Sequence, residues 1–183
     1  MRHLVYDVAS SLDGYIAAPG DDISAFPMKG DHAAAYQARL ETYDTVVMGR
    51  RTYEFGYGFG LKAGARAYPH MRHFIFSRTI SLPGASDVEV VRTDWLQTID
   101  AMKSEDGTDI YLCGGGRMAG YLLQHGRIDR LIVKLAPIIL GSGVALFEGM
   151  TATTHLTVAS VTPYKTGVTL MEYEVNPSGC DPS

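Results

Sequence analysis

Short apolar segments with strand character alternate along the chain with segments of helical periodicity, and this alternation restricts the fold more than any other feature. Strands are predicted at residues 44–49, 73–78 and 109–113, and helices at residues 31–43 and 95–103. Strands joined by helices usually lie parallel in one sheet that carries helices on both faces. The pattern therefore predicts a three-layer α/β fold with a mixed, mainly parallel sheet.

The two ends of the chain complete this sheet. Residues 3–10 read as a strand that ends in a turn, and residues 128–141 read as one long apolar strand. Two β-rich runs between residues 155 and 175 meet at a Thr-Gly turn and predict an antiparallel hairpin at the sheet edge. We expect one domain over residues 1–176, followed by a disordered Pro/Gly/Ser tail at residues 177–183.

Composition excludes several classes of protein. The 183 residues are 46% hydrophobic and 20% charged, as in an ordinary globular domain, and no apolar run approaches the roughly 20 residues that span a bilayer. The net charge of −4 with dispersed Lys and Arg argues against nucleic-acid and membrane partners. Two cysteines and six histidines without ligand spacing indicate neither a disulfide framework nor a metal site. The start of the chain lacks signal-peptide features, so we expect a cytoplasmic protein.

The strongest chemical signal is YLCGGGRMA at residues 111–119, where a strand passes through three glycines into a helix. Glycine lets a backbone approach a ligand closely, and the free N–H groups at a helix start favour an anion. The spacing of Gly114, Gly116 and Ala119 matches a dinucleotide-binding motif, but Lys134 stands where a Rossmann fold would have its acidic ribose ligand. The alternative is a turn that serves only helix–strand packing.

Two further strand ends carry polar residues. MGRRTY at residues 48–53 places Arg50 and Arg51 at a helix start, where cations oppose the helix dipole unless an anion lies between them. The alternative is that both arginines point into solvent. FSRT at residues 76–79 ends a third strand with Ser, Arg and Thr. Because the ends of parallel strands share one sheet edge, the three junctions together favour a dinucleotide with an extra phosphate.

In this order, VVMGRRTYE, FIFSRT and YLCGGGRMAGYLL resemble the dihydrofolate reductase fold. SLDGYIA and IDRLIVKLAPIILGSGVALF more closely resemble the reductase domain of the bifunctional riboflavin-biosynthesis deaminase–reductase, which also occurs in stand-alone bacterial proteins. The resemblance covers about residues 2–175. It implies an NADPH-dependent reductase of a small heterocyclic, carbonyl or imine substrate, with 5-amino-6-(5-phosphoribosylamino)uracil reductase as the nearest activity.

The resemblance also implies which residues bind NADPH. Arg50 or Arg51 would face the 2′-phosphate, and two guanidinium groups there would favour NADPH over NADH. The backbone that flanks the nicotinamide would be Ala9, Ile16 and Ala17. The helix start that binds the cofactor phosphates would be Gly49, Arg50, Arg51 and Thr52, with Thr52 facing the pyrophosphate. Ser77 and Arg78 would lie beside the 2′-phosphate, and the pyrophosphate turn and the helix that follows it would be Gly114, Gly115, Gly116, Arg117 and Met118.

The substrate half departs from both families. Met71 stands where dihydrofolate reductases have an arginine, and Cys113 stands where riboflavin-pathway reductases usually have a glutamate. Asp31 matches the catalytic carboxylate of dihydrofolate reductases after a gap. Asp13 would lie near the nicotinamide, where it could order a loop or relay a proton. The alternative is that Asp13 only forms a turn. Both are candidate catalytic residues.

Three functions therefore stay open. The first is reduction of a pyrimidine or related heterocycle, the second is dihydrofolate reduction, and the third is non-catalytic binding of NADPH. The long apolar segment at residues 128–140 and the edge of the C-terminal hairpin also predict a homodimer.

Overall fold

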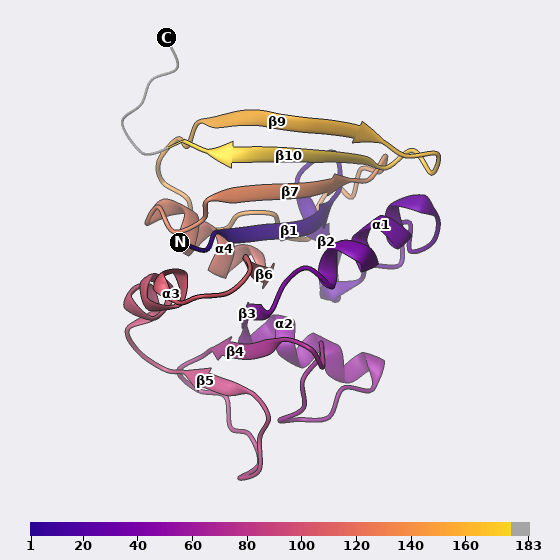
Figure 1. The fold of residues 1–183 in the computed structure, drawn as a ribbon. Helices are drawn as coiled ribbons and strands as arrows, with labels where there is room; N and C mark the ends of the chain where they lie inside the picture. Colours follow the sequence, from indigo (N-terminus) through magenta and orange to yellow (C-terminus); the bar gives the residue numbers. More distant parts are fainter. Residues whose placement is uncertain (177–183) are drawn as a thin grey trace.

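The computed structural model describes residues 1–176, and its centre is one eight-stranded sheet (Figure 1). The strand order is β5-β4-β3-β6-β1-β7-β10-β9. The pairs from β5 to β7 are parallel, whereas β10 pairs antiparallel with both β7 and β9. The strands of this sheet are β1 (Leu4–Ser10), β3 (Thr45–Gly49), β4 (Arg72–Phe76), β5 (Glu89–Val91), β6 (Ile110–Gly114), β7 (Arg130–Leu135), β9 (Leu156–Pro163) and β10 (Thr169–Val175).

A small second sheet pairs β2 (Tyr15–Ala17) with β8 (Val144–Ala145). The helices are α1 (Asp31–Leu40), α2 (Arg50–Phe55), α3 (Trp95–Ser104) and α4 (Gly116–Gln124), with short 3-10 turns η1 (Pro19–Asp21) and η2 (Gly56–Phe59). The mixed, mainly parallel sheet and its antiparallel hairpin confirm the predicted fold class. The predicted tail, residues 177–183, lies outside the described residues.

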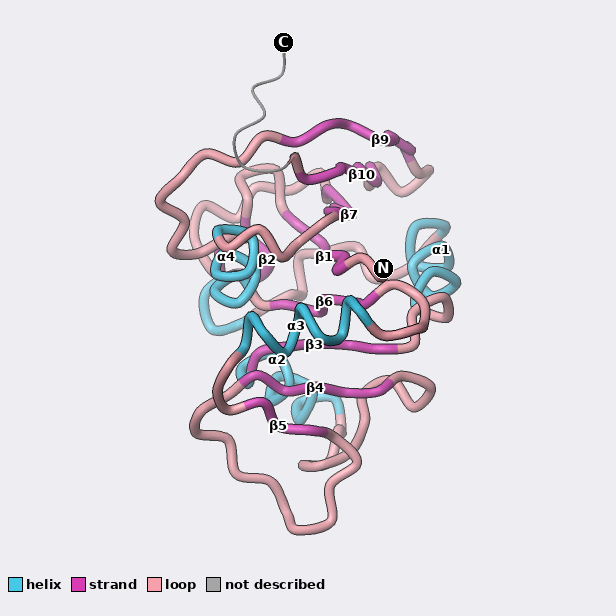
Figure 2. The backbone as a smooth tube through the Cα atoms, turned by 60° about the vertical axis from the view of Figure 1, so that its left-hand side comes forward, coloured by secondary structure: helices cyan, strands magenta, loops and turns pink. Residues whose placement is uncertain are grey.

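The alternation of side chains along the strands determines which helices cover which face. Leu4, Tyr6 and Val8 of β1 belong to a buried cluster that includes side chains of α3 and α4. Val5, between them, belongs to a second cluster on the opposite face that includes side chains of α1 and α2. Figure 2 shows α1 and α4 on opposite sides of the sheet. Asp7 has the same parity as Val5 and therefore points to the α1 face.

The prediction of one strand over residues 128–141 is wrong, because β7 ends at Leu135. The N–H of Ala136 still donates to the carbonyl of Ser10, but Pro137 has no N–H with which to continue the ladder. Beyond it, Gly141 and Gly143 adopt positive φ angles of 77° and 144°. The segment therefore bends away from the sheet and reaches β8 beside β2.

His73 on β4 is buried, and both of its ring nitrogens have partners. Nε2 accepts a hydrogen bond from the backbone N–H of Tyr68 at 3.1 Å, and Nδ1 donates to the carbonyl of Met71 at 3.1 Å. The ring stacks on that of Tyr68 at a centroid distance of 5.8 Å. Only the neutral imidazole satisfies this arrangement, and burial lowers the pKa of His73 to about 4.

This geometry predicts an acid-sensitive fold. The unfolded chain takes up a proton at His73 near the ordinary pKa of 6.5, whereas the folded chain resists it down to about 4. The contribution of His73 is therefore complete above pH 6.5 and is lost as the pH falls toward 4. In urea denaturation at a series of pH values, the wild-type free energy of unfolding should fall more steeply over this window than that of His73→Gln. His155→Gln, at an exposed site, should keep the wild-type slope; equal slopes for wild type and His73→Gln would contradict the assignment.

Candidate functional site

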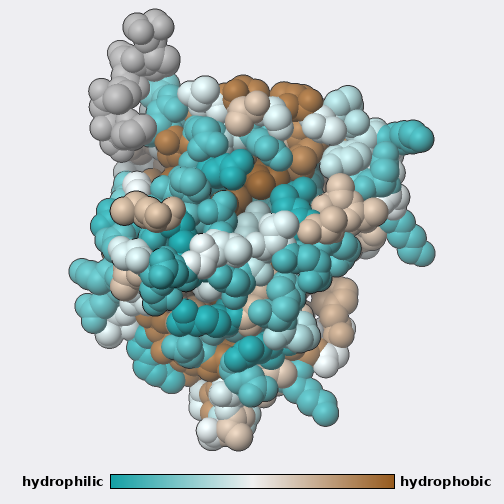
Figure 3. All heavy atoms as spheres, viewed as in Figure 1, coloured by the Kyte–Doolittle hydropathy of each residue, from teal (hydrophilic) through white to brown (hydrophobic). Residues whose placement is uncertain are grey.

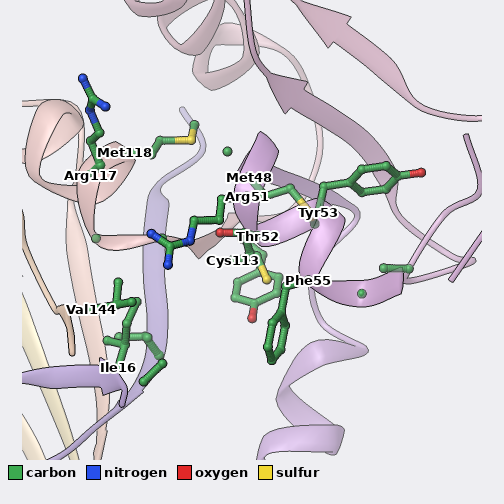
Figure 4. Close-up of a pocket in the computed structure, with 18 of the residues that line it drawn as sticks. Ile16, Met48, Arg51, Thr52, Tyr53, Phe55, Cys113, Arg117, Met118 and Val144 are labelled. Atoms are coloured by element: carbon green, nitrogen blue, oxygen red, sulfur yellow. The ribbon is translucent and has the colours of Figure 1, made fainter. Parts of the chain in front are cut away.

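A cavity of about 1420 Å³ lies at the carboxyl ends of the parallel strands, where α/β sheets usually bind ligands (Figure 4). It is bordered by the junction of β3 with α2, the end of β4, and the junction of β6 with α4. Ile16 and Val144, from β2 and β8, lie together on one side of it. The cavity continues beneath α1, so it has one half at the strand–helix junctions and a second half between α1 and the sheet.

The structure brings the predicted cofactor residues together around the first half. The following residues line the cavity: Ala9, Ile16, Ala17, Gly49, Arg50, Arg51, Thr52, Ser77, Arg78, Gly115, Gly116, Arg117 and Met118. Gly114 is the last residue of β6, immediately before this lining. Strand ends that are far apart in sequence therefore meet at one edge, as the parallel sheet predicted.

The two glycines that follow Gly114 serve different purposes. A Cβ on Gly115 would lie 3.3 Å from Oγ1 of Thr52 and 3.9 Å from Cδ1 of Ile16, so a side chain there would crowd Thr52 at the cavity wall. A Cβ on Gly116 would lie 1.9 Å from the carbonyl oxygen of Ala145, which backbone packing forbids. Gly115 therefore fits the interpretation of the turn as a ligand-binding element, and Gly116 fits the interpretation of the turn as a helix–strand packing element.

Arg50 and Arg51 diverge from the start of α2. Nε of Arg50 lies 3.0 Å from Glu54, and its Nη1 donates to Oγ1 of Thr79 at 2.9 Å, at the end of β4. Arg51 instead pairs with Asp21 of η1 at 2.7 Å. Both pairs are exposed, and such pairs contribute only about 0–1 kcal/mol, so an anionic ligand can replace the carboxylates at little cost. The alternative in which both arginines contact only solvent is not what the structure shows.

Asp13 and Asp31 do not line the cavity, and each carboxylate holds backbone N–H groups of a distant loop. Asp13 accepts from Leu140 at 3.1 Å and from Gly141 at 2.7 Å. A hydrogen bond from Ser11, together with these N–H groups, lowers the pKa of Asp13 to about 2. Asp31 accepts from the N–H of Lys165 at 2.9 Å, in the turn between β9 and β10. These positions do not support a catalytic role for either residue.

The second half of the cavity contains charged residues that the sequence analysis missed as site residues. Oδ1 of Asp7 lies 2.7 Å from Nζ of Lys134, and Oδ2 lies 2.5 Å from Nε of Arg39. Asp7 and Lys134 are almost fully buried, and both line the cavity. A detectable signal was present, since Asp7 is the only charge in the strand segment LVYDVAS and Lys134 follows three apolar residues in RLIVKL.

Hydroxyl and thiol groups surround this charged cluster. The hydroxyl oxygens of Tyr36 and Tyr111 lie 2.7 Å apart, and the hydroxyl of Tyr68 lies 3.8 Å from Sγ of Cys113. Burial raises the pKa of Tyr36 and of Tyr111 above the ordinary value, and it also raises the pKa of the Cys113 thiol. These groups therefore stay protonated and offer neutral hydrogen-bonding atoms to a ligand.

Two further properties concern the described part of the chain. Among residues 1–176, no helix combines the length and apolar character needed to cross a membrane. In the same residues, no three His, Cys, Asp or Glu side chains are grouped so that they could hold a metal ion.

The sheet order and the junction-lined cavity define a protein with a dihydrofolate reductase-like fold. The dihydrofolate reductase from Enterococcus faecalis, solved with NADP(H), is similar with a TM-score of 0.68 and 16% identity, over 96% of this chain and 97% of that chain. Within this class, the chain belongs to the RibD C-terminal domain family, whose model matches residues 2–170.

Two other relatives match over most of their length. A putative riboflavin biosynthesis protein from Shewanella sp. PV-4 superposes with a TM-score of 0.81 at 26% identity, and the match covers 97% of this chain and all of that chain (100%). The uncharacterized protein YwjB of Bacillus subtilis (strain 168) is 31% identical over 160 residues, which cover 85% of this chain and 88% of that protein.

Proposed function

We propose that this protein is an NADPH-dependent reductase that transfers hydride to a small heterocyclic, carbonyl or imine substrate. Its activity would be most like that of 5-amino-6-(5-phosphoribosylamino)uracil reductase. The RibD C-terminal family supports a reductase role. The name of a structural neighbour from Thermotoga maritima includes this activity; its TM-score is 0.71 at 16% identity, and the match covers 57% of that chain. The observation that carries the proposal is that Arg50 at the start of α2, Arg78 after β4 and the bare backbone of Gly115 all line one cavity.

The residues of the first half fit NADPH. Gly115 brings backbone without a side chain to the cavity wall beside Thr52, at the start of α4, where a pyrophosphate could approach N–H groups. Arg50 and the residues after β4 also line the first half, and the nicotinamide would lie toward the second half. When bound there, NADPH would supply the hydride.

The structure favours Arg50 over Arg51 as the residue for the 2′-phosphate. Arg50 donates to Thr79, directly after Ser77 and Arg78, whereas Arg51 turns away to Asp21. Oγ of Ser77 accepts from the N–H groups of Thr79 at 3.2 Å and Ile80 at 3.0 Å, so it fixes the turn that carries Arg78. Arg50 and Arg78 would then hold the 2′-phosphate between them.

The second half would bind the substrate. Its tyrosine rings provide flat apolar surfaces, and its hydroxyls donate and accept hydrogen bonds at the rim of a planar ring. Met71, at the position where dihydrofolate reductases have an arginine, is completely buried in the core, and its neighbour Arg72 pairs with Glu105 at 2.8 Å. A pyrimidine or similar small ring is therefore favoured over dihydrofolate.

The proposed function is tested with the purified full chain. NADPH oxidation, followed at the nicotinamide absorbance, should accelerate when 5-amino-6-(5-phosphoribosylamino)uracil is added and less so with dihydrofolate. Binding of NADPH without turnover of a panel of heterocycles would instead identify a non-catalytic NADPH-binding protein. Failure to bind NADPH would contradict both readings.

Cofactor preference gives a second prediction. Wild-type protein should bind NADPH about 10–100-fold more tightly than NADH, equivalent to about 1.4–2.8 kcal/mol. Arg50→Gln should weaken NADPH binding by at least about tenfold and leave NADH binding nearly unchanged, because only NADPH carries the 2′-phosphate. Arg127→Gln, which removes an ion pair with Asp100 outside the cavity, is the matched control in fluorescence titrations. Equal wild-type affinities for the two cofactors would refute the phosphate assignment.

We also propose a homodimer that forms through the edge of the sheet at β9. Val158 and Val161 of this strand are 56% and 52% exposed, and Figure 3 shows apolar surface at this end of the molecule. Exposed apolar edge strands pair readily with another chain. Light scattering at micromolar concentration should give twice the chain mass of 19.9 kDa. Val158→Glu with Val161→Glu should yield the monomer, whereas Leu12→Glu at another exposed site should not; a monomeric wild type would contradict the proposal.

A further inference from the structure

We infer that Lys134 is a catalytic residue, whose ammonium group donates a hydrogen bond, and then a proton, to the substrate nitrogen or oxygen that becomes negative on hydride transfer. This inference rests on the proposed reductase function and names the residue that would complete its reaction. It also specifies the substrate class as a planar ring with a C=N or C=O bond whose heteroatom reaches the floor of the cavity.

The position of Lys134 is determined by the sheet. On β7, Leu131 and Val133 point to the α3 and α4 side, so Ile132 and Lys134 point to the α1 side. There the Lys134 side chain is only 9% exposed, and it lines the second half of the cavity beneath α1. A lysine is rarely buried to this degree without a pairing or functional reason.

The hydrogen bonds of Lys134 leave part of its donor capacity for a ligand. An ammonium group has three N–H donors. One donates to Oδ1 of Asp7 at 2.7 Å, and Nζ lies 3.5 Å from the ring centroid of Tyr36, where a second contact is a cation–π interaction. Within residues 1–176 the Nζ atom makes no other hydrogen bond, so a third N–H is available to a molecule in the cavity.

The charges of the cluster do not balance. Asp7 supplies one negative charge, whereas Lys134 and Arg39 supply two positive charges. The other titratable groups that face Lys134 are Tyr36 and Cys113, and burial raises the pKa of both, so they stay neutral. One positive charge therefore lacks a partner in a largely water-excluded site, and an anion formed on the substrate would compensate it.

Hydride transfer produces such an anion. The substrate carbon gains a C–H bond as the C4–H bond of the reduced nicotinamide breaks, and the electron pair of the C=N or C=O bond moves to nitrogen or oxygen. The Nζ–H bond of Lys134 then breaks as its proton forms the new N–H or O–H bond, and the neutral amine takes a proton from water. Burial lowers the pKa of Lys134, which makes it a better proton donor. Asp7 and Arg39 are positioning residues, because they hold Nζ in place.

The tyrosine hydroxyls are less suitable proton donors. A proton lost from Tyr36 or Tyr111 would leave a phenolate in a buried site, and burial raises the pKa of both residues. They would instead orient the ring by hydrogen bonds. This difference assigns the proton transfer to Lys134.

A binding experiment tests the inference without requiring turnover. Uracil is neutral near pH 7, whereas 5-nitrouracil is an anion and represents the negatively charged state of the substrate. In calorimetric titrations of full-length protein saturated with NADP⁺, wild type should prefer 5-nitrouracil by about tenfold. Lys134→Met should reduce this preference several-fold, because Asp7 and Arg39 then balance each other and only the positive nicotinamide ring of NADP⁺ still attracts the anion. Lys134→Arg should retain it, since the charge is kept.

The matched control is Lys103→Met, which removes a lysine paired with Asp129 at 2.8 Å outside the cavity and should leave the preference unchanged. Lys134→Met is expected to fold because Arg39 still pairs with Asp7. If it does not fold, Lys134→Gln removes the charge and can still donate to Asp7. An unchanged preference in the charge-removing variant, or no wild-type preference, would overturn the inference.

Two further measurements separate this inference from the proposed function. All variants should bind NADPH with wild-type affinity, because Lys134 lies outside the cofactor half. If the wild-type protein does not bind NADPH, the proposed function itself is refuted. If it binds NADPH but does not prefer 5-nitrouracil over uracil, only the role of Lys134 is refuted. With a turned-over substrate, Lys134→Met should reduce the rate of hydride transfer by about 100-fold.

Discussion

The buried ion pair between Asp7 and Lys134 connects two adjacent interior strands of the sheet, β1 and β7. Arg39 joins the same carboxylate from α1, so one aspartate attaches a helix to two strands. Breaking such a pair by removing one partner usually costs about 3–5 kcal/mol, because the remaining charge stays buried. The second half of the cavity lies between α1 and the sheet, and Asp7 therefore links the two elements that enclose it.

The two halves of the cavity use charge in different ways. In the first half, Arg50 and Arg51 form exposed pairs that a phosphate can displace, so the proposed cofactor site would fill and empty at low cost. In the second half the charges are buried and their geometry is fixed before a ligand arrives. Fixed charge near the reacting atoms is the more effective arrangement for stabilising a charge that exists only during the reaction.

The fold class and the meeting of the three strand ends at one cavity could be predicted from the sequence, because both depend on local patterns. The strand ends at Gly49 and Ser77 and the turn at Gly115 carry their own signals, and a parallel sheet necessarily brings them together. The role of Asp13 could not be predicted in this way, because its partners Leu140 and Gly141 are more than 120 residues away in sequence. The predicted strand extended too far, to residue 141, because the apolar run continues past Pro137. Proline has no N–H for the strand ladder, and this determines where β7 ends more strongly than the hydrophobicity of the following residues does.

The same buried cluster accounts for one departure from the related families, the cysteine at position 113. Where riboflavin-pathway reductases usually have a glutamate, this chain has Cys113, which faces Lys134 and remains neutral. A carboxylate at that position would add a second negative charge beside Asp7 and would cancel the excess positive charge of Lys134 and Arg39. The cysteine therefore preserves one uncompensated positive charge at the floor of the cavity. A substrate that becomes anionic during the reaction would be stabilised there, whereas one that carries a positive charge would be repelled.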